Sequence, residues 1–368
     1  RLGVNAGVRK PSIPASITMS RMALSDYDAL LVLSFGGPEA RDEVIPFLEN
    51  VTRGRGIPRE RLAEVGEHYF YFDGVSPINE QNRQLVANLE RELAARQHSL
   101  PVYLGNRNWR PFGEDTARRI AEDGHRNVLV FATSAWGGYS ACRQYDEDII
   151  RLRDVTPEVE YTKLWQFYGN PTFVSLMAQQ VKEAVLRAPE AGARVLFSAH
   201  SVPSAADNAA GGPGDANLYS RQVEEASRLI AEQAGVTDYE VVWQSRSGNP
   251  ATPWLEPDIV DRSIELHDAY GITHVVCVPV GFITDHMEVV WDLDTELNKA
   301  CEQRGITLDR VATVGLKDEF AGMIVDIAEC VAQGVEPQTL SAVTVQGCTV
   351  NGAPCAPDCC APAQRPAS

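Results

Sequence analysis

Residues 194–201 read RVLFSAHS, and residues 273–282 read THVVCVPVGF. Both are short, continuous apolar runs, and neither shows the alternation of a strand that has one solvated face. Strands that are buried on both faces of a parallel sheet have this composition. Further runs of the same kind are ALLVLSF (29–35), PVYLGN (101–106), NVLVFATS (127–134) and YEVVWQS (239–245). The sequence therefore predicts six short strands in parallel sheets.

Helical patterns lie between these runs and after the last of them. The clearest are INEQNRQLVANLERELAARQ (78–97), PTFVSLMAQQVKEAVLRA (171–188), NLYSRQVEEASRLIAEQAG (217–235) and DEFAGMIVDIAECVAQG (318–334). Strands that alternate with helices build an α/β fold with right-handed crossovers. The strands fall into two sets of three. We therefore expect two similar Rossmann-like, doubly wound domains whose parallel sheets, of about four strands each, face a central cleft.

The expected organisation has five parts. They are a disordered or added extension (1–25), an N-terminal Rossmann-like domain (26–165), a C-terminal Rossmann-like domain (166–310), a C-terminal helix (311–345) and a Cys/Pro-rich tail (346–368). The first residues, RLGVNAGVRKPSIPASITMSRM, lack the apolar core of a secretory signal. Cysteines scattered through the body suggest reduced thiols, so we expect a cytoplasmic protein.

The composition of the chain excludes two classes of partner. Its 368 residues carry 33 Lys and Arg against 50 Asp and Glu, a formal net charge of −17. A surface this acidic repels phosphate backbones, so we expect no nucleic-acid binding. The longest apolar runs, such as VVCVPVGF, are too short to cross a bilayer, and we expect no integral membrane segment.

Ligands of doubly wound folds bind at the carboxyl ends of the strands, so the residues found there are the first candidates. Gly36 and Gly37 follow the first strand, and Arg53 and Arg55 come later in TRGRG. The two arginines could bind carboxylate or phosphate groups, or they could simply be solvated. Behind the third strand, Trp136, Tyr139 and Tyr145 could line a flat apolar site or serve as ordinary packing.

Two strand ends in the second half carry groups with more specific chemistry. His200 ends its strand in SAHS, where it is a proton acceptor, a metal ligand or a structural histidine. PVGFITDHMEVVWDLDTEL contains Asp285, Glu288, Asp292 and Glu296. The last three are four residues apart, which aligns their carboxylates on one face of a helix. Such a row is destabilising unless a cation or protons use it; the alternative is a solvated helix start.

The tail GCTVNGAPCAPDCCAPAQ concentrates Cys348, Cys355, Cys359 and Cys360 in a stretch with little to pack a core. Disulfides fit poorly with a reducing compartment. A zinc site would need four cysteines, because no histidine follows His286. Four thiolates also suit an iron–sulfur cluster.

Taken in order, several motifs of this chain resemble those of the ferrochelatases. They are LLVLSFGGPE, FLENVTRGRG, FDGVSPINEQ, ATSAWGGYSACRQY, FSAHSVP, WQSRSG with PWLEPD, and PVGFITDHMEVVWDLD. The resemblance runs from about Asp28 to about Glu296, and the chain is most similar to the actinobacterial, coproporphyrin-type members. It implies two Rossmann-like domains without a dinucleotide fingerprint, and insertion of Fe²⁺ into a porphyrin during haem b biosynthesis.

The resemblance also implies roles for individual residues. His200 and Glu288 match the family's active-site histidine and glutamate, with Asp292 and Glu296 behind Glu288 as a path for metal or protons. Ser76 in GVSPIN and Tyr145 in CRQY match porphyrin contacts. Some relatives have an iron-ligating tyrosine where this chain has Phe35, so we do not expect iron ligation from that side.

The implied substrate is coproporphyrin III. Its four propionates need cationic or hydrogen-bonding partners, for which Arg53, Arg55, Arg107, Ser76 and Asn108 are candidates. The competing interpretations are a protoporphyrin IX ferrochelatase, a non-catalytic porphyrin or haem carrier, and a chelatase that inserts cobalt into another tetrapyrrole. We also expect transient contacts with neighbouring enzymes of the haem pathway.

For the tail, the resemblance implies a [2Fe–2S] cluster. Some ferrochelatases hold one with three C-terminal cysteines and one from the body of the chain. The matching residues are Cys142, Cys348, Cys355 and Cys360, the last chosen over Cys359 because the family separates its final pair by four residues.

Overall fold

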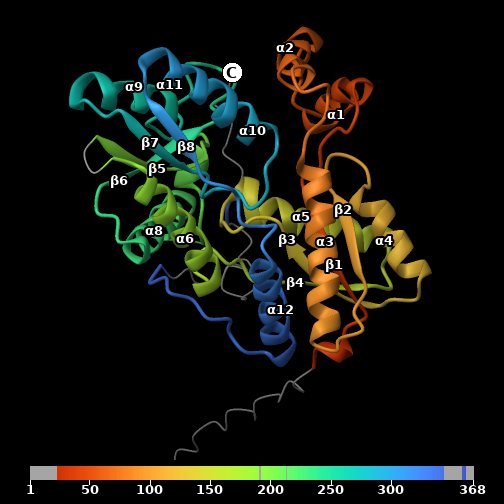
Figure 1. Ribbon diagram of the computed structural model, residues 1–368. Coiled ribbons are helices and arrows are strands. Elements are labelled where there is room, and N and C mark those ends of the chain that lie inside the picture. The colour runs from red at the N-terminus through yellow and green to blue at the C-terminus, as the bar shows by residue number, and fades with distance from the viewer. Residues whose placement is uncertain (1–22, 190–191, 213, 344–358, 362–368) are drawn as a thin grey trace, which may run out of the picture.

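The computed structural model describes residues 23–189, 192–212, 214–343 and 359–361. These residues form two parallel four-stranded sheets, ordered β2-β1-β3-β4 and β6-β5-β7-β8. Figure 1 shows the two α/β halves side by side. The strands are β1 (Ala29–Ser34), β2 (Val102–Asn106), β3 (Asn127–Ala132), β4 (Glu160–Lys163), β5 (Ala193–His200), β6 (Tyr239–Gln244), β7 (His274–Val278) and β8 (Thr307–Arg310).

The six strands expected from the apolar runs are confirmed, and so is the expectation of two parallel sheets with about four strands each, because one further strand completes each sheet. The strands that the sequence pattern missed are β4 (EYTK) and β8 (TLDR). Each pairs on one side only, with β3 and β7 respectively, and so lies at an edge of its sheet. Edge strands need no continuous apolar run, because solvent reaches one side of them.

Helices cover both faces of each sheet. They are α1 (Val44–Val51), α2 (Arg59–Phe70), α3 (Ile78–Ala95), α4 (Gly113–Glu122), α5 (Gln144–Val155), α6 (Pro171–Arg187), α7 (Ser204–Asn208), α8 (Leu218–Ala234), α9 (Ile259–Tyr270), α10 (Met287–Val290), α11 (Asn298–Arg304) and α12 (Asp318–Gln333). Short 3₁₀ helices, η1 (Leu24–Asp26) and η2 (Arg41–Glu43), and short π-helices, η3 (Tyr139–Arg143) and η4 (Asp292–Leu297), complete the set.

The four helices that the periodicity predicted end within two residues of the predicted positions. Local chemistry explains these ends. At the start of α6, Pro171 takes the first turn and the Asn170 side chain accepts a hydrogen bond from the Thr172 amide at 2.9 Å. At the end of α8, Gly235 adopts a left-handed conformation that few other residues tolerate.

The C-terminal helix α12 packs on the N-terminal half of the molecule. It lies beside α3 (Figure 1), where Arg96 and Asp326 form an ion pair at 2.6 Å. From this helix, Phe320 packs edge-on against Phe131 of β3 and against Phe167, with ring centroids 6.2 and 5.6 Å apart. Because all three rings are fully buried, this helix ties the end of the chain to the first sheet.

None of the helices in the described residues combines the length and the apolar composition needed to cross a bilayer.

Candidate functional site

The carboxylate of Glu288 lies between two imidazoles at the carboxyl end of the second sheet. His200 is the last residue of β5, and its Nε2 is 3.2 Å from Oε1 of Glu288. His286 approaches the other oxygen, with Nε2 3.2 Å from Oε2. The side chains of His200 and Glu288 are 32% and 43% exposed, so the pair can be reached from outside.

Neighbouring residues fix both members of this pair. The Tyr219 hydroxyl of α8 donates a hydrogen bond to the His200 carbonyl at 2.8 Å. Gln244, which pairs with His200 across β5 and β6, donates from its side chain to the Glu288 carbonyl at 2.6 Å. Gly281 allows the chain to pass close to β5, since a Cβ there would lie 2.7 Å from the Ala199 Cα.

The two charges stabilise each other. Burial disfavours the charged imidazole, but the Glu288 carboxylate outweighs this effect and raises the pKa of His200 to about 9. Burial also disfavours the Glu288 carboxylate, but His200 and then His286 outweigh it and hold its pKa well below the usual range. At neutral pH the pair is therefore an imidazolium bonded to a carboxylate.

Asp292 extends the site away from His200. Burial raises its pKa to about 7, and the charges of Glu288 and Glu296 add to this, against a hydrogen bond from Ser245. A carboxyl group with such a pKa can exchange protons near neutrality. Glu296 is exposed and lies at the outer end of this row.

The three aligned acidic residues lie in a helical segment, as expected, but the type of helix changes along it. Glu288 belongs to the short α-helix α10, and Asp292 and Glu296 belong to the π-helix η4. The fourth acidic residue of the motif, Asp285, is turned to other partners. It lies 3.3 Å from Arg310 and accepts a hydrogen bond from the Thr313 hydroxyl at 3.2 Å.

The last turn of α2, from the N-terminal half, faces this acidic row. Burial raises the pKa of the Tyr69 hydroxyl, and the charges of Glu288 and Asp292 raise it further. The Tyr69 ring also packs against Phe47 at a centroid distance of 5.8 Å. Residues of both halves therefore surround the same carboxylates.

The expected porphyrin contacts divide into buried and exposed groups. Ser76, Tyr145 and Asn108 are 4%, 5% and 8% exposed and lie near the carboxyl ends of the first sheet. A Cβ on Gly37 would lie 2.8 Å from the Ser76 Cβ, so this glycine makes room for the serine. Arg53 and Arg55 are fully on the surface, in the segment between α1 and α2.

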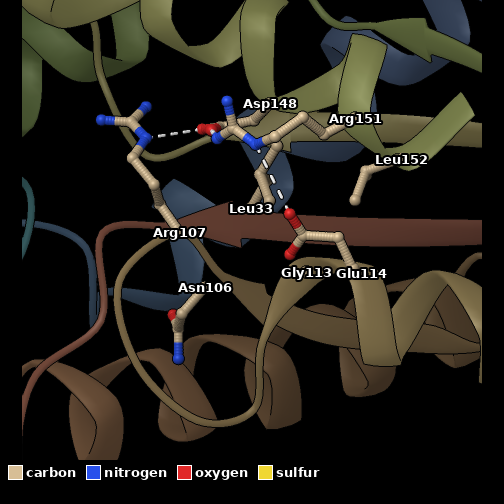
Figure 2. Close-up of a pocket in the computed structure, with 8 residues that line it drawn as sticks. All are labelled: Leu33, Asn106, Arg107, Gly113, Glu114, Asp148, Arg151 and Leu152. Carbon is tan, nitrogen blue, oxygen red and sulfur yellow. Dashed lines mark hydrogen bonds and ion pairs between the residues drawn. The ribbon is translucent and has the colours of Figure 1, made fainter. Parts of the chain in front are cut away.

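Arg107 is less free than its sequence position suggests. Figure 2 shows its guanidinium pointing to Asp148, which it meets at 2.7 Å, while Arg151 reaches Glu114 in the same pocket. The guanidinium also lies over the Tyr145 ring, 4.6 Å from the centroid. Its Nη2 is nevertheless buried without a hydrogen-bond partner among the described residues.

Two of the four candidate cluster cysteines, Cys142 and Cys360, come together, with Cys359 beside them. All three are buried, with 3.7 Å between the sulfurs of Cys359 and Cys360 and a hydrogen bond between Cys142 and Cys360. Cys348 and Cys355 lie outside the described residues. No set of three or more His, Cys, Asp or Glu side chains within the described ranges is arranged closely enough to hold a metal ion.

Phe35 has no metal-binding atom and packs edge-on against Phe47, with ring centroids 6.3 Å apart. Sequence reasoning missed His286, Gln244, Ser245 and Tyr69. His286 could have been found, because it stands two residues before Glu288 in DHMEVV. The other three are far from Glu288 in sequence, and only the fold brings them close.

Comparisons with known proteins identify the family of this chain. The family model described as Ferrochelatase matches residues 27–331. Coproporphyrin III ferrochelatase of Corynebacterium glutamicum is 56% identical over 354 residues, covering 94% of this chain and 95% of the relative. The protein of the same name from Corynebacterium diphtheriae is 52% identical, covering 94% and 97%. That from Nocardia farcinica is 51% identical, covering 93% and 98%.

Among solved structures, SirB from Bacillus subtilis with Fe³⁺ matches with a TM-score of 0.51 at 15% identity, covering 83% of this chain and 97% of that one. This likeness bears on the fold alone, and it confirms the expected pair of chelatase-like α/β domains. The family match spans both domains and includes His200, His286 and Glu288. The chain belongs to the ferrochelatase family.

Proposed function

We propose that this ferrochelatase inserts Fe²⁺ into coproporphyrin III, giving Fe-coproporphyrin III for haem b biosynthesis. The observation that carries the proposal is the Glu288 carboxylate held between His200 and His286, with Asp292 behind it. Relatives that are 50–56% identical over most of their length have coproporphyrin III ferrochelatase as their name, which supports the choice of substrate.

Insertion replaces two pyrrole N–H protons by one Fe²⁺, so the site must supply a metal path and accept two protons. Glu288 offers anionic oxygen that suits Fe²⁺. When the cation reaches this carboxylate, it cancels the field that holds the proton on His200, and we propose that this proton passes to solvent water, directly or by way of Asp292 and Glu296. The neutral imidazole can then accept a pyrrole proton or bind the iron. Asp292 and Glu296 provide a row along which metal enters or protons leave.

Unpartnered donors in the first domain support a substrate with several propionates. Arg107 Nη2 and Asn108 Nδ2 are both buried and have no acceptor within the described residues. A buried donor without a partner costs about 1–3 kcal/mol, and a propionate carboxylate would satisfy it. We propose that Ser76 and Tyr145 also contact the porphyrin, and that the exposed Arg53 and Arg55 meet a propionate that reaches solvent.

The substrate preference is the first prediction. We expect kcat/KM to be higher for coproporphyrin III than for protoporphyrin IX, because the latter has two propionates fewer to meet these donors. The measurement is anaerobic insertion of Fe²⁺ into each porphyrin, followed by absorbance. A higher kcat/KM for protoporphyrin IX would overturn the proposed substrate.

The same assay distinguishes a ferrochelatase from a porphyrin carrier and from a cobalt chelatase. A carrier would bind the porphyrin, as seen by fluorescence quenching, and leave it metal-free. A cobalt chelatase would turn over Co²⁺ and leave Fe²⁺ unused. Turnover of Fe²⁺ with coproporphyrin III contradicts both.

We also propose that Cys142, Cys348, Cys355 and Cys360 hold a [2Fe–2S] cluster. The described cysteines fit its donor chemistry, since buried sulfurs of Cys142 and Cys360 already meet. The Gly211 amide donates to the Cys360 sulfur at 3.3 Å, and the Gly138 amide to that of Cys142 at 3.4 Å. Such a cluster would join the tail to η3 of the first domain.

We propose a cytoplasmic location and transient contacts with neighbouring haem-pathway enzymes.

The cluster gives the second prediction. Cys360→Ser should abolish the visible absorption and the bound iron and sulfide of the purified protein, and should make the tail sensitive to protease. Cys359→Ser is the matched control and should do neither, because the family's spacing of four residues between its final pair of cysteines selects Cys360 as the ligand. If Cys359→Ser alone bleaches the protein, the choice of ligand is wrong. Zinc in place of iron would refute the cluster itself.

A further inference from the structure

We propose that His68 is a positioning residue for iron insertion. Its ring stacks on Trp291 of the other domain and thereby fixes the helical segment that carries Glu288 and Asp292. The inference rests on the proposed function for its kinetic consequence, while the stacking itself can be measured without turnover.

The contact joins the two halves of the molecule at the acidic row. The imidazole of His68, in the last turn of α2, lies on the indole of Trp291 with ring centroids 4.2 Å apart and planes only 10° from parallel. Tyr71, at the end of the same helix, meets the indole edge-on at 5.6 Å and 77°. One aromatic side chain of the second domain is thus held on two sides by the first.

Trp291 lies between the α-helix α10 and the π-helix η4, where the acidic segment changes from one type of helix to the other. It follows α10, which carries Glu288, and directly precedes Asp292 in η4. Its amide donates to the Met287 carbonyl at 2.8 Å, and its carbonyl accepts from the Glu296 amide, five residues ahead, at 2.8 Å. A displacement of Trp291 as a whole would therefore shift the backbone that carries both carboxylates.

Stacking is what holds this ring in place. The indole Nε1 is buried and has no hydrogen-bond partner among the described residues, so no polar contact fixes its orientation. An indole is wide and flat, and its preferred contacts are parallel or edge-on rings at these distances. His68 supplies the parallel contact and Tyr71 the edge.

The imidazole has a second conceivable role, as a group that takes protons from the row. Burial lowers the pKa of His68, opposed by the charge of Glu296 and aided by that of Arg61, so the site favours the neutral form of the ring. A neutral ring stacks as an aromatic surface, which a phenyl ring can replace. The two roles therefore predict different behaviour for His68→Phe.

The test compares His68→Ala, His68→Phe and Trp291→Ala, together with the double variant His68→Ala/Trp291→Ala. We expect His68→Ala to raise the KM for Fe²⁺ by between about two- and tenfold, the range of a single aromatic pair, with the KM for the porphyrin unchanged. His68→Phe should restore the wild-type value. The double variant should be no worse than Trp291→Ala, because both changes remove one contact.

His125→Ala is the matched control, since His125 also packs against an aromatic ring, that of Tyr103 at 5.8 Å, but within the first domain. It should leave the KM for Fe²⁺ unchanged. Additive losses in the double variant would overturn the proposal. So would a His68→Phe variant as poor as His68→Ala, which would show that the ring nitrogens are needed.

Tryptophan fluorescence reads the stack independently of turnover. The change in emission caused by His68→Ala should disappear when the same change is made in a Trp291→Phe background. If the wild-type enzyme does not insert iron, the proposed function is refuted, but the fluorescence evidence for the stacking is unaffected. If the emission change persists in the Trp291→Phe background, the stacking of His68 on Trp291 is refuted instead.

Discussion

His200→Ala should reduce iron insertion by about a hundred- to ten-thousandfold, the usual contribution of a positioned acid or base. The variant loses the group that meets Glu288 at 3.2 Å and that can accept a pyrrole proton or bind the iron. Glu288 keeps its contact with His286, so the carboxylate retains one partner but loses its link to the strand end. The measurement is kcat/KM for Fe²⁺ under anaerobic conditions.

The fold should survive this change. The His200 side chain is 32% exposed and stands at a strand end, where it contributes little packing. His98→Ala is a matched control, because His98 also meets a carboxylate, that of Glu329 at 3.1 Å, but on α12 beside α3. We expect both variants to unfold within a few degrees of the wild type and only His200→Ala to lose activity. Near-normal turnover of His200→Ala would disprove its assigned role.

The fold was predictable from the sequence wherever a buried strand appears as a continuous run of apolar residues. Strands such as β5 and β7 are covered on both faces and read as apolar runs, so their positions were visible. The edge strands β4 and β8 were not, because EYTK and TLDR are short and mostly polar. Their extended conformation comes from pairing with β3 and β7, which is a tertiary effect that single-residue patterns do not contain.

The site was predictable in its centre and less so in its surroundings. The strand-end rule and the family motif both lead to His200 and Glu288, and the structure brings them together. Arg107 behaves differently. In sequence it is a cation in a loop, but the fold pairs it with Asp148, which lies 41 residues further on. Which charges are already neutralised depends on long-range packing, and sequence proximity does not reveal it.

Glu288→Gln should lower kcat/KM for Fe²⁺ by about ten- to a hundredfold, as expected for the loss of a charged hydrogen bond of about 1.5–3 kcal/mol. The amide keeps the shape of the side chain but removes the anionic oxygen that receives the cation. Glu329→Gln is the matched control, since it neutralises a carboxylate that faces His98 instead. It should leave insertion unchanged. Full activity in Glu288→Gln would exclude this carboxylate from the metal path.

The same variant should change how stability depends on pH. In the wild type the pKa of His200 is about 9 against an ordinary 6.5, so its stabilising contribution is complete below pH 6.5 and is lost as the pH rises through about 9. Without the carboxylate, the pKa of His200 falls back toward its ordinary value, and this loss should shrink. Groups outside the site titrate alike in both proteins, so the difference in melting temperature between wild type and Glu288→Gln reports on His200 together with Asp292, whose pKa of about 7 also responds to the charge of Glu288. We expect that difference to decrease between pH 6.5 and 9, and a constant difference would refute the ion pair.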